Sequence, residues 1–406
     1  MTQAIDAGER VVSLDLETHG PEALIKRAAE LVPLLRENAV RCHNERRIPS
    51  ENLSAMRQAG LLRMSRPRRY GGHEAMVATK TAVFGELARG CGSTAWVTTL
   101  YEDAAFLISL FPDEVQDEVF ADQDTLITAT LIPAGKAQPQ GEGFLVNGKW
   151  PFNTGCLDAT YVVEPAVVEL SKGAPEVCLF LMPYSELVIE DDWSPVGLRG
   201  TGSNSVRAKD VYVRPERMLR LADVMRGIYG TKLNKGPLYR VPPIPYIVSS
   251  AGGTFPGLAQ SAFELVTERL VGRPITYTLY TDRAQAPVTH LQLGEAALKI
   301  KAANHLMTEV ADRLDRRALN NEALTPDEGP MIWGIIGYTS RIYAEVIESL
   351  RQMSGASALS ETSAIQAVAR NAQALATHAM LIPTTGIEHY GRAICGLPPN
   401  TPFLSS

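Results

Sequence analysis

Apolar residues recur every three or four positions over much of residues 1–125, which is the spacing of one face of an amphipathic helix. In the segment 22–43, Leu24, Ala28 and Leu31 follow this spacing. We therefore expect residues 1–125 to form an N-terminal helical domain. Its further helices are predicted over 50–60, 75–89 and 93–110, with another that begins at Pro112.

The pattern changes over residues 126–222, where threonine and valine become frequent and glycine and proline interrupt short apolar runs. Such runs are typical of β-strands. Strands at this spacing indicate a β domain that is a small barrel or a sandwich. The strands are predicted over 125–131, 143–146, 160–168, 177–182 and 206–213.

Helical periodicity returns over residues 246–406, and long helices with short connections indicate a C-terminal four-helix bundle. Residues 223–245 contain glycine and proline with little periodicity, so we expect a linker or a lid-like loop there. The predicted fold is thus mostly α with a central β domain. The four long helices are predicted over 257–271, 287–320, 326–353 and 363–380.

One short stretch suggests a binding site. The pair Asn147-Gly148 is typical of a tight hairpin turn, and it follows the strand-like run Phe144-Leu145-Val146. The residues after it, Gly148-Lys149-Trp150-Pro151-Phe152-Asn153-Thr154-Gly155, place aromatic rings and then a small hydroxyl beside that turn. This arrangement suits a flat heteroaromatic cofactor. The alternative is an ordinary hairpin with a core tryptophan.

Composition excludes several classes of protein. The net charge is −6 and no basic stripe is present, so nucleic acid is not expected as a partner. The five cysteines are scattered, which predicts neither a disulfide framework nor a metal site and fits a reducing cytoplasm. Residues 1–19 lack the apolar core of a signal peptide. No run of about 18 apolar residues is present, so no membrane span is expected.

A second segment carries a family resemblance. It runs Trp193-Ser194-Pro195-Val196-Gly197-Leu198-Arg199-Gly200-Thr201-Gly202-Ser203-Asn204-Ser205-Val206. Together with the stretch from Gly148 to Gly155, it resembles the acyl-CoA dehydrogenase superfamily and, within it, the two-component flavin-dependent monooxygenases. The resemblance covers nearly the whole chain. It implies a helical domain, a β domain and a helical bundle in this order.

The choice between dehydrogenase and monooxygenase depends on one position. Acyl-CoA dehydrogenases need a carboxylate that removes a proton next to the thioester, and many carry it in a Tyr-Glu-Gly-Thr run of the last helix. The matching run here ends in Thr377-His378-Ala379-Met380, so Ala379 stands where the glutamate is expected. This favours the monooxygenase branch.

That branch implies the oxygenase component of a two-component system. A separate flavin reductase supplies reduced FMN or FAD, and O₂ forms a flavin C4a-hydroperoxide that hydroxylates a small, aromatic organic substrate. The resemblance also implies a homotetramer. Three alternatives stay open: an N-oxygenase of a nucleotide-linked amino sugar, an acyl-CoA dehydrogenase and a flavin-free scaffold. The first is kept open by the charged loop residues Lys232, Lys235 and Arg240.

By position within the resemblance, Thr154 would donate a hydrogen bond near the flavin N5 atom. Trp150 and Phe152 would pack on or near the ring, and Asn153 would contact its pyrimidine edge. An ordinary strand threonine and core aromatic residues are the alternatives.

The resemblance also places Thr128 and Thr130 on a flavin-facing strand, where alternation puts both on one face. Arg269 or Arg273 would bind the flavin phosphate, and the sequence leaves the choice between them open. The alternative for Thr128 and Thr130 is an ordinary outward strand position, and the alternative for Arg269 and Arg273 is a surface charge.

Substrate contacts are expected from the helix 93–110 and from the last helix. Trp96 and Tyr101 would line the substrate pocket, and Asp103 or Glu102 would replace the histidine of related phenol hydroxylases. His378 would orient substrate or act as an acid or base near neutral pH. In addition, His389 and Arg392 are expected to close the site from the chain's tail.

Overall fold

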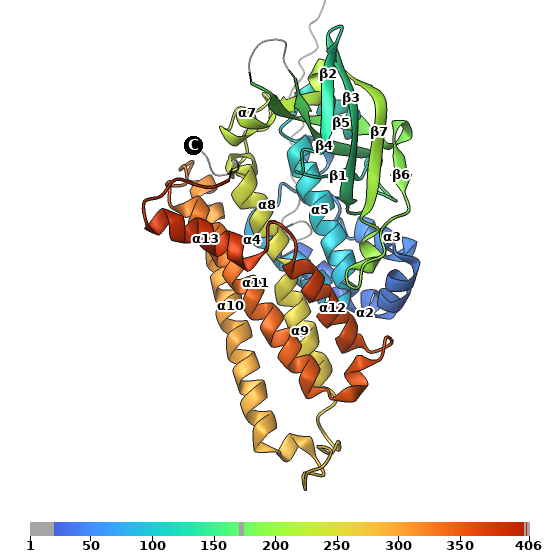
Figure 1. Ribbon diagram of the computed structural model, residues 1–406, viewed down its shortest axis with the longest axis vertical. Coiled ribbons are helices and arrows are strands. Elements are labelled where there is room, and N and C mark those ends of the chain that lie inside the picture. Colours follow the sequence, from blue (N-terminus) through green and yellow to red (C-terminus); the bar gives the residue numbers. More distant parts are fainter. Residues whose placement is uncertain (1–19, 170–173, 402, 404–406) are drawn as a thin grey trace, which may run out of the picture.

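The computed structural model describes residues 20–169, 174–401 and 403 of the chain. The segment 1–19, for which a polar stretch without a signal peptide is predicted, lies outside the described residues. Figure 1 shows a sheet at one end of the molecule, a bundle of long helices at the other and helix α5 against the sheet. The N-terminal helices are α2 (Pro21–Glu45), α3 (Ser50–Gln58), α4 (Val77–Gly90), α5 (Gly92–Ile108) and α6 (Asp113–Val119).

The central domain is one eight-stranded sheet. Along its main path the strands follow the order β6-β7-β3-β2-β4-β5-β8, and β1 pairs in parallel with β4. The β2–β4 pair is also parallel, and the other pairs are antiparallel. The strands are β1 (Ile127–Ala129), β2 (Gly135–Gln140), β3 (Gly143–Asn153), β4 (Tyr161–Val168), β5 (Glu176–Pro183), β6 (Val188–Glu190), β7 (Asn204–Val213) and β8 (Met218–Arg220).

The hairpin predicted at Asn147-Gly148 is wrong, because both residues lie inside the long strand β3. The turn between β2 and β3 is at residues 141–142 instead. Opposite β7, the register of β3 shifts between Val146 and Gly148, which is a β-bulge. The Asn147 amide donates to the Asp210 carboxylate over 3.0 Å and accepts from the Asp210 backbone N–H over 2.8 Å. The Asn147-Gly148 pair therefore forms part of a β-bulge and not of a turn.

Trp150 is the central side chain of the β core. It is fully buried, and its indole Nε1–H donates to the Pro165 carbonyl on β4 over 2.8 Å. Gly135 on β2 and Gly148 on β3 leave room for the indole, because a Cβ at either position would overlap its ring. The indole is thus enclosed by the sheet.

The four long helices predicted for the C-terminal part are confirmed, while two shorter ones, α8 and α13, were not predicted. The segment expected to be a loop is partly packed, since Leu238 and Tyr239 within it are buried. Prolines in the first turn of α8 obscured that helix in the sequence. The helices are α7 (Leu221–Met225), α8 (Pro243–Gly252), α9 (Thr254–Thr267), α10 (Pro287–Leu319), α11 (Glu328–Met353), α12 (Ala364–Ala376) and α13 (Pro383–Ile394).

Helices α4, α8, α9 and α11 share one large apolar core with α5 and part of the sheet. None of the helices in the described part of the chain combines the length and the apolar character needed to cross a membrane. The same residues contain no group of His, Cys, Asp and Glu side chains that would hold a metal ion.

Replacing Gly135 with alanine tests the packing around Trp150. The added methyl group would overlap the buried indole, and overpacking of this kind destabilises by about 1–3 kcal/mol. We expect a lower midpoint of urea unfolding for Gly135→Ala. Gly294→Ala is the matched control, because Gly294 lies within α10 with no neighbouring atom that a Cβ would meet. Equal midpoints for Gly135→Ala and the wild type would contradict the packing described here.

Candidate active site

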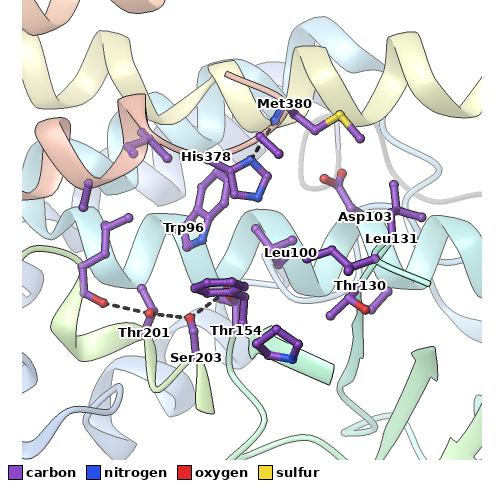
Figure 2. Close-up of a pocket in the computed structure, with 18 of the residues that line it drawn as sticks. Trp96, Leu100, Asp103, Thr130, Leu131, Thr154, Thr201, Ser203, His378 and Met380 are labelled. Atoms are coloured by element: carbon purple, nitrogen blue, oxygen red, sulfur yellow. Dashed lines mark hydrogen bonds between the residues drawn. The ribbon is translucent and has the colours of Figure 1, made fainter. Parts of the chain in front are cut away.

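A cavity of about 540 Å³ lies where the β domain meets the helices. Helix α5 forms one wall and the end of β1 another, and the chain just past β3 contributes Thr154 (Figure 2). The loop 193–203, one residue of α8 and the segment 374–380 complete it. Most of its lining is apolar, and Leu100, Leu107 and Leu131 are typical members.

Three hydroxyl groups form a continuous hydrogen-bond chain along one wall of this cavity (Figure 2). The Thr154 and Ser203 oxygens are 2.8 Å apart, and the Ser203 and Thr201 oxygens are 2.6 Å apart. The Thr201 hydroxyl donates to the Leu198 carbonyl over 2.8 Å. Because a hydroxyl has one proton, Ser203 must then donate to Thr201 and Thr154 to Ser203. Thr154 therefore presents its lone pairs, rather than its proton, to the cavity.

This direction differs from the one expected from the sequence. Thr154 was expected to donate a hydrogen bond to a bound ring, whereas the chain of hydroxyls directs its proton to Ser203. The direction could not be predicted from the sequence, because it depends on the Leu198 carbonyl at the far end of the chain of hydroxyls.

The loop that carries Thr201 and Ser203 is wedged between two helices. A Cβ on Gly197 would overlap the Arg370 carbonyl of α12, and one on Gly200 would overlap the Cys42 sulfur of α2. The Leu198 backbone N–H donates to the Asn371 side chain over 2.8 Å. The glycines of the Gly-Leu-Arg-Gly-Thr-Gly-Ser segment are thus explained by close approach of its backbone to the helices.

Tyr101 holds Thr154 in place from α5. Its hydroxyl donates to the Gly155 carbonyl over 2.7 Å, and the Gly155 N–H donates to the Thr201 carbonyl over 2.9 Å. The Tyr101 side chain does not line the cavity. Its predicted role in substrate binding is therefore replaced by a role in positioning the turn that carries Thr154.

Phe152 is the aromatic residue of β3 that reaches the cavity. It is 59% exposed, and its ring lies edge-on to Trp193 at a centroid distance of 6.0 Å. Its φ of 66° is in the left-handed region, which is rare for an aromatic residue and often found at functional sites. Trp150, two residues earlier, remains enclosed in the sheet and does not line the cavity.

His378 and Trp96 meet on the opposite wall. Their ring centroids are 5.0 Å apart and the rings are nearly perpendicular. The His378 Nδ1 atom accepts a hydrogen bond from the Met380 backbone N–H over 3.3 Å, which assigns the ring proton to Nε2. Burial lowers the pKa of His378 to about 4, so the imidazole is neutral at pH 7. His378 lies in the turn after α12 and not within the helix predicted for it.

Asp103 projects from α5 into the same cavity (Figure 2). Its two carboxylate oxygens are buried. Burial raises the pKa of Asp103 to about 8, although the Lys80 ammonium opposes this rise. The carboxyl is therefore protonated at pH 7 and offers an O–H donor. The adjacent Glu102 faces away from the cavity and accepts from the Ser65 backbone N–H over 2.5 Å.

Of the other residues predicted for the β domain, Thr130 lines the cavity, and Thr128 and Asn153 do not. The Thr128 hydroxyl is hydrogen-bonded to the Tyr184 hydroxyl over 2.6 Å. Asn153 is fully buried, and its amide donates to the Trp150 carbonyl over 3.1 Å. Thr128 and Asn153 thus belong to the layer behind the wall.

The predicted residues of the C-terminal part, apart from His378, lie elsewhere. Arg269 and Arg273 are exposed beyond the end of α9. The segment that joins α9 to α10 lies at the end of the bundle opposite the sheet (Figure 1). His389 packs on Trp333 with 4.7 Å between ring centroids, and Arg392 donates to the Pro398 carbonyl. His389 and Arg392 therefore do not close the cavity.

Thr201 and Ser203 are the site residues that sequence reasoning missed. Both lie in the Trp193–Val206 segment, where small hydroxyl side chains beside glycines were the pattern that could have indicated a binding site. Leu198 also contributes through its carbonyl, which side-chain chemistry does not reveal.

Two sequence profiles match this chain. Residues 20–121 match the acyl-CoA dehydrogenase N-terminal domain and residues 250–383 match the acyl-CoA dehydrogenase C-terminal domain. The fold and the site thus define a protein of the acyl-CoA dehydrogenase class.

Individual relatives narrow the class. The oxygenase subunit HsaA of a flavin-dependent monooxygenase from Mycobacterium tuberculosis is 30% identical over 393 residues, which is 95% of this chain and 98% of that protein. The oxygenase component of an FADH₂-dependent resorcinol hydroxylase from a Rhizobium species is 27% identical, with 93% and 95% covered. The structure of XiaF from a Streptomyces species, solved with FADH₂ and glycerol, is 29% identical with a TM-score of 0.89 and covers 94% of this chain and 97% of XiaF. The chain belongs to the family of flavin-dependent monooxygenase oxygenase subunits.

The protonation of Asp103 has a spectroscopic test. We expect the wild-type infrared spectrum at pH 7 to contain the carbonyl stretch of a buried carboxylic acid that is absent from Asp103→Asn. This band should disappear as the pH rises through about 8, because the raised pKa places ionisation there. Asp210→Asn, which alters an exposed carboxylate, is the control. A wild-type spectrum that matches that of Asp103→Asn at pH 7 would show that Asp103 is ionised.

Proposed function

We propose that this chain is the oxygenase component of a two-component flavin-dependent monooxygenase that hydroxylates an uncharged aromatic substrate. The observation that supports this most directly is the chain of three hydroxyls ending at Thr154, in a cavity whose remaining lining is mainly apolar. A separate flavin reductase supplies the reduced flavin. Bound there, reduced flavin provides the electrons that activate O₂.

The residues present fit a reduced flavin in particular. Reduced flavin carries a proton on N5, whereas oxidised flavin has a lone pair there. Because Thr154 donates to Ser203, it would hold a bound flavin by accepting a hydrogen bond from N5–H, which only the reduced form offers. Phe152 and Trp193 flank the same side of the cavity and supply aromatic surface for the ring.

Water exclusion is the second contribution of the protein. Leu100, Leu107 and Leu131 line the cavity, and apolar walls keep water from a reactive centre. Thr154 is itself a buried residue, with 7% of its surface exposed. Oxygen activated in this space is thereby directed to substrate rather than released as hydrogen peroxide.

The charge state of the lining selects the substrate. Asp103 and His378 are the ionisable side chains that line the cavity among the described residues, and both are neutral at pH 7. A phenolic or carbonyl oxygen of the substrate accepts from the Asp103 carboxyl or from the His378 Nε2–H. Trp96 packs against His378 and holds it in this orientation. A carboxylate-bearing substrate would find no cation here.

The same lining disfavours the two enzymatic alternatives. A nucleotide-linked sugar needs cations for its phosphates, but Arg240 donates to the Ala318 carbonyl and no described lysine or arginine lines the cavity. An acyl-CoA dehydrogenase needs an ionised base, whereas Asp103 is protonated and Ala379 occupies the glutamate position.

We further propose FAD rather than FMN as the flavin, because XiaF binds FADH₂ and the resorcinol hydroxylase depends on it. A homotetramer is proposed from the family resemblance. Arg269 and Arg273, far from the cavity of their own chain, would then be available to the flavin phosphate of another subunit. A cytoplasmic location is in keeping with the five free cysteines.

The function is tested by single-turnover mixing of the protein and reduced FAD with oxygen-18 gas and neutral phenols. Mass spectrometry should detect one labelled oxygen atom in the hydroxylated product. Anaerobic titration with reduced FAD and reduced FMN, at matched concentrations, should show tighter binding of FAD. Failure to bind either reduced flavin would exclude the proposed function.

Thr154→Ala should increase the release of hydrogen peroxide per flavin oxidised by about 2–10-fold, the effect of losing a hydrogen bond worth roughly 0.5–1.5 kcal/mol. The Thr154→Ser variant keeps the hydroxyl and should behave as the wild type. A fluorometric peroxide assay in single turnover measures the difference. Equal peroxide yields from Thr154→Ala and Thr154→Ser would remove the hydroxyl from the mechanism.

A further inference from the structure

Glu164 is a carboxyl group in the apolar core of the sheet. It lies on β4 and is fully buried. Because side chains alternate along a strand, it shares a face with Val162 and Ala166, which both belong to the β core around Trp150. A buried carboxyl is destabilising unless its surroundings accommodate it, so its presence in this core calls for a role.

The contacts of Glu164 lead directly to the cavity wall. Its Oε2 atom is hydrogen-bonded to the hydroxyl of Thr130, which lines the cavity. Its Oε1 atom is buried and has no hydrogen-bond partner. The Asn153 Oδ1 atom is also buried and unpartnered, while the Asn153 amide group donates one of its two protons to the Trp150 carbonyl. The hydrogen bond with Thr130 is thus the link between Glu164 and the cavity wall.

The charge environment of Glu164 favours its protonated form. Burial raises the pKa of Glu164 to about 8, and only the neighbouring Thr130 and Asn153 side chains oppose the rise. Burial also raises the pKa of the Tyr184 hydroxyl, a titratable neighbour of Glu164. No cation is among the groups that act on Glu164. Without a counter-charge, the buried carboxyl keeps its proton.

We propose that Glu164 is a protonated positioning residue that fixes the Thr130 hydroxyl for flavin binding. The Glu164 Oε2 atom accepts the Thr130 proton, and the carboxyl group's own proton is on Oε1. Thr130 then presents lone pairs to the cavity, as Thr154 does on the neighbouring wall. This proposal rests on the proposed function, because the ligand of Thr130 is taken to be the reduced flavin.

The flavin-free protein provides the first test. The pKa of Glu164 is higher in the folded than in the unfolded chain, so its protonated form stabilises the fold at low pH, and this contribution is lost as the pH rises toward about 8. Glu164→Gln retains an acceptor for Thr130, is uncharged like the protonated carboxyl, and does not titrate. From pH 6 to pH 9 we expect the melting temperature of Glu164→Gln to rise relative to the wild type by about 3 °C or more.

The exposed Glu176, which pairs with Arg220 in the same sheet, gives the control variant Glu176→Gln. From pH 6 to pH 9, the melting temperature of Glu176→Gln should not rise relative to that of the wild type. A Glu164→Gln profile parallel to the wild type over this pH range would show that Glu164 is already ionised and would overturn the proposal.

The link to Thr130 is tested by binding of reduced FAD under anaerobic conditions. At pH 7, Glu164→Leu should weaken binding roughly fivefold or more, an effect of about 1 kcal/mol, and Glu164→Gln should stay near the wild type. In a Thr130→Val background, Glu164→Leu should have little further effect. Fully additive effects of the two substitutions would overturn the positioning role. If Glu164→Leu does not fold, Glu164→Ala, which also removes the acceptor for Thr130, is measured in both backgrounds instead.

The two proposals fail in different ways. A wild type that does not bind reduced FAD would exclude the proposed function, and with it the flavin role of Thr130, even where the melting data show a protonated Glu164. A wild type that binds reduced FAD while Glu164 and Thr130 act independently would exclude only the inference drawn here.

Discussion

The hydrogen bond from Thr201 to the Leu198 carbonyl sets the direction of every hydroxyl that follows it in the site. A backbone carbonyl accepts and never donates, so the protons of Thr201, Ser203 and Thr154 must all point back toward it. The Leu198 carbonyl is itself held by the docking of its loop on α12 through Asn371. A side chain on the bundle thereby helps to set which way the Thr154 hydroxyl of the β domain points at the cavity.

Strand β3 supplies both a residue of the β core and a residue of the cavity, and two glycines make room for the core residue. Trp150 turns into the sheet over Gly135 and Gly148, whereas the register shift after Trp150 brings Phe152 to the cavity. Without the shift, strict alternation would place residues 150 and 152 on one face. A single bulge thus separates two aromatic residues that look equivalent in the sequence.

Long elements were predictable because their periodicity extends over many residues. The helices α10 and α11 and the strands β4 and β5 were found within a few residues of their bounds. Asn147-Gly148 was misread because the same dipeptide suits a turn and a bulge. The location of Thr154, Asp103 and His378 at one cavity came from a family resemblance, whereas the direction of the Thr154 hydrogen bond and the burial of Trp150 depend on contacts between distant segments. Such contacts leave no local pattern in the sequence.

Phe152 shows what the fold gives up to build this cavity. Its left-handed backbone would be relaxed for glycine, and an aromatic residue held there costs on the order of 1–3 kcal/mol. The side chain is more than half exposed, so its own burial recovers little of that amount. The end of β3 is therefore a place where the fold gives up stability for a preorganised aromatic surface. Stabilising substitutions there are expected to come at the expense of activity.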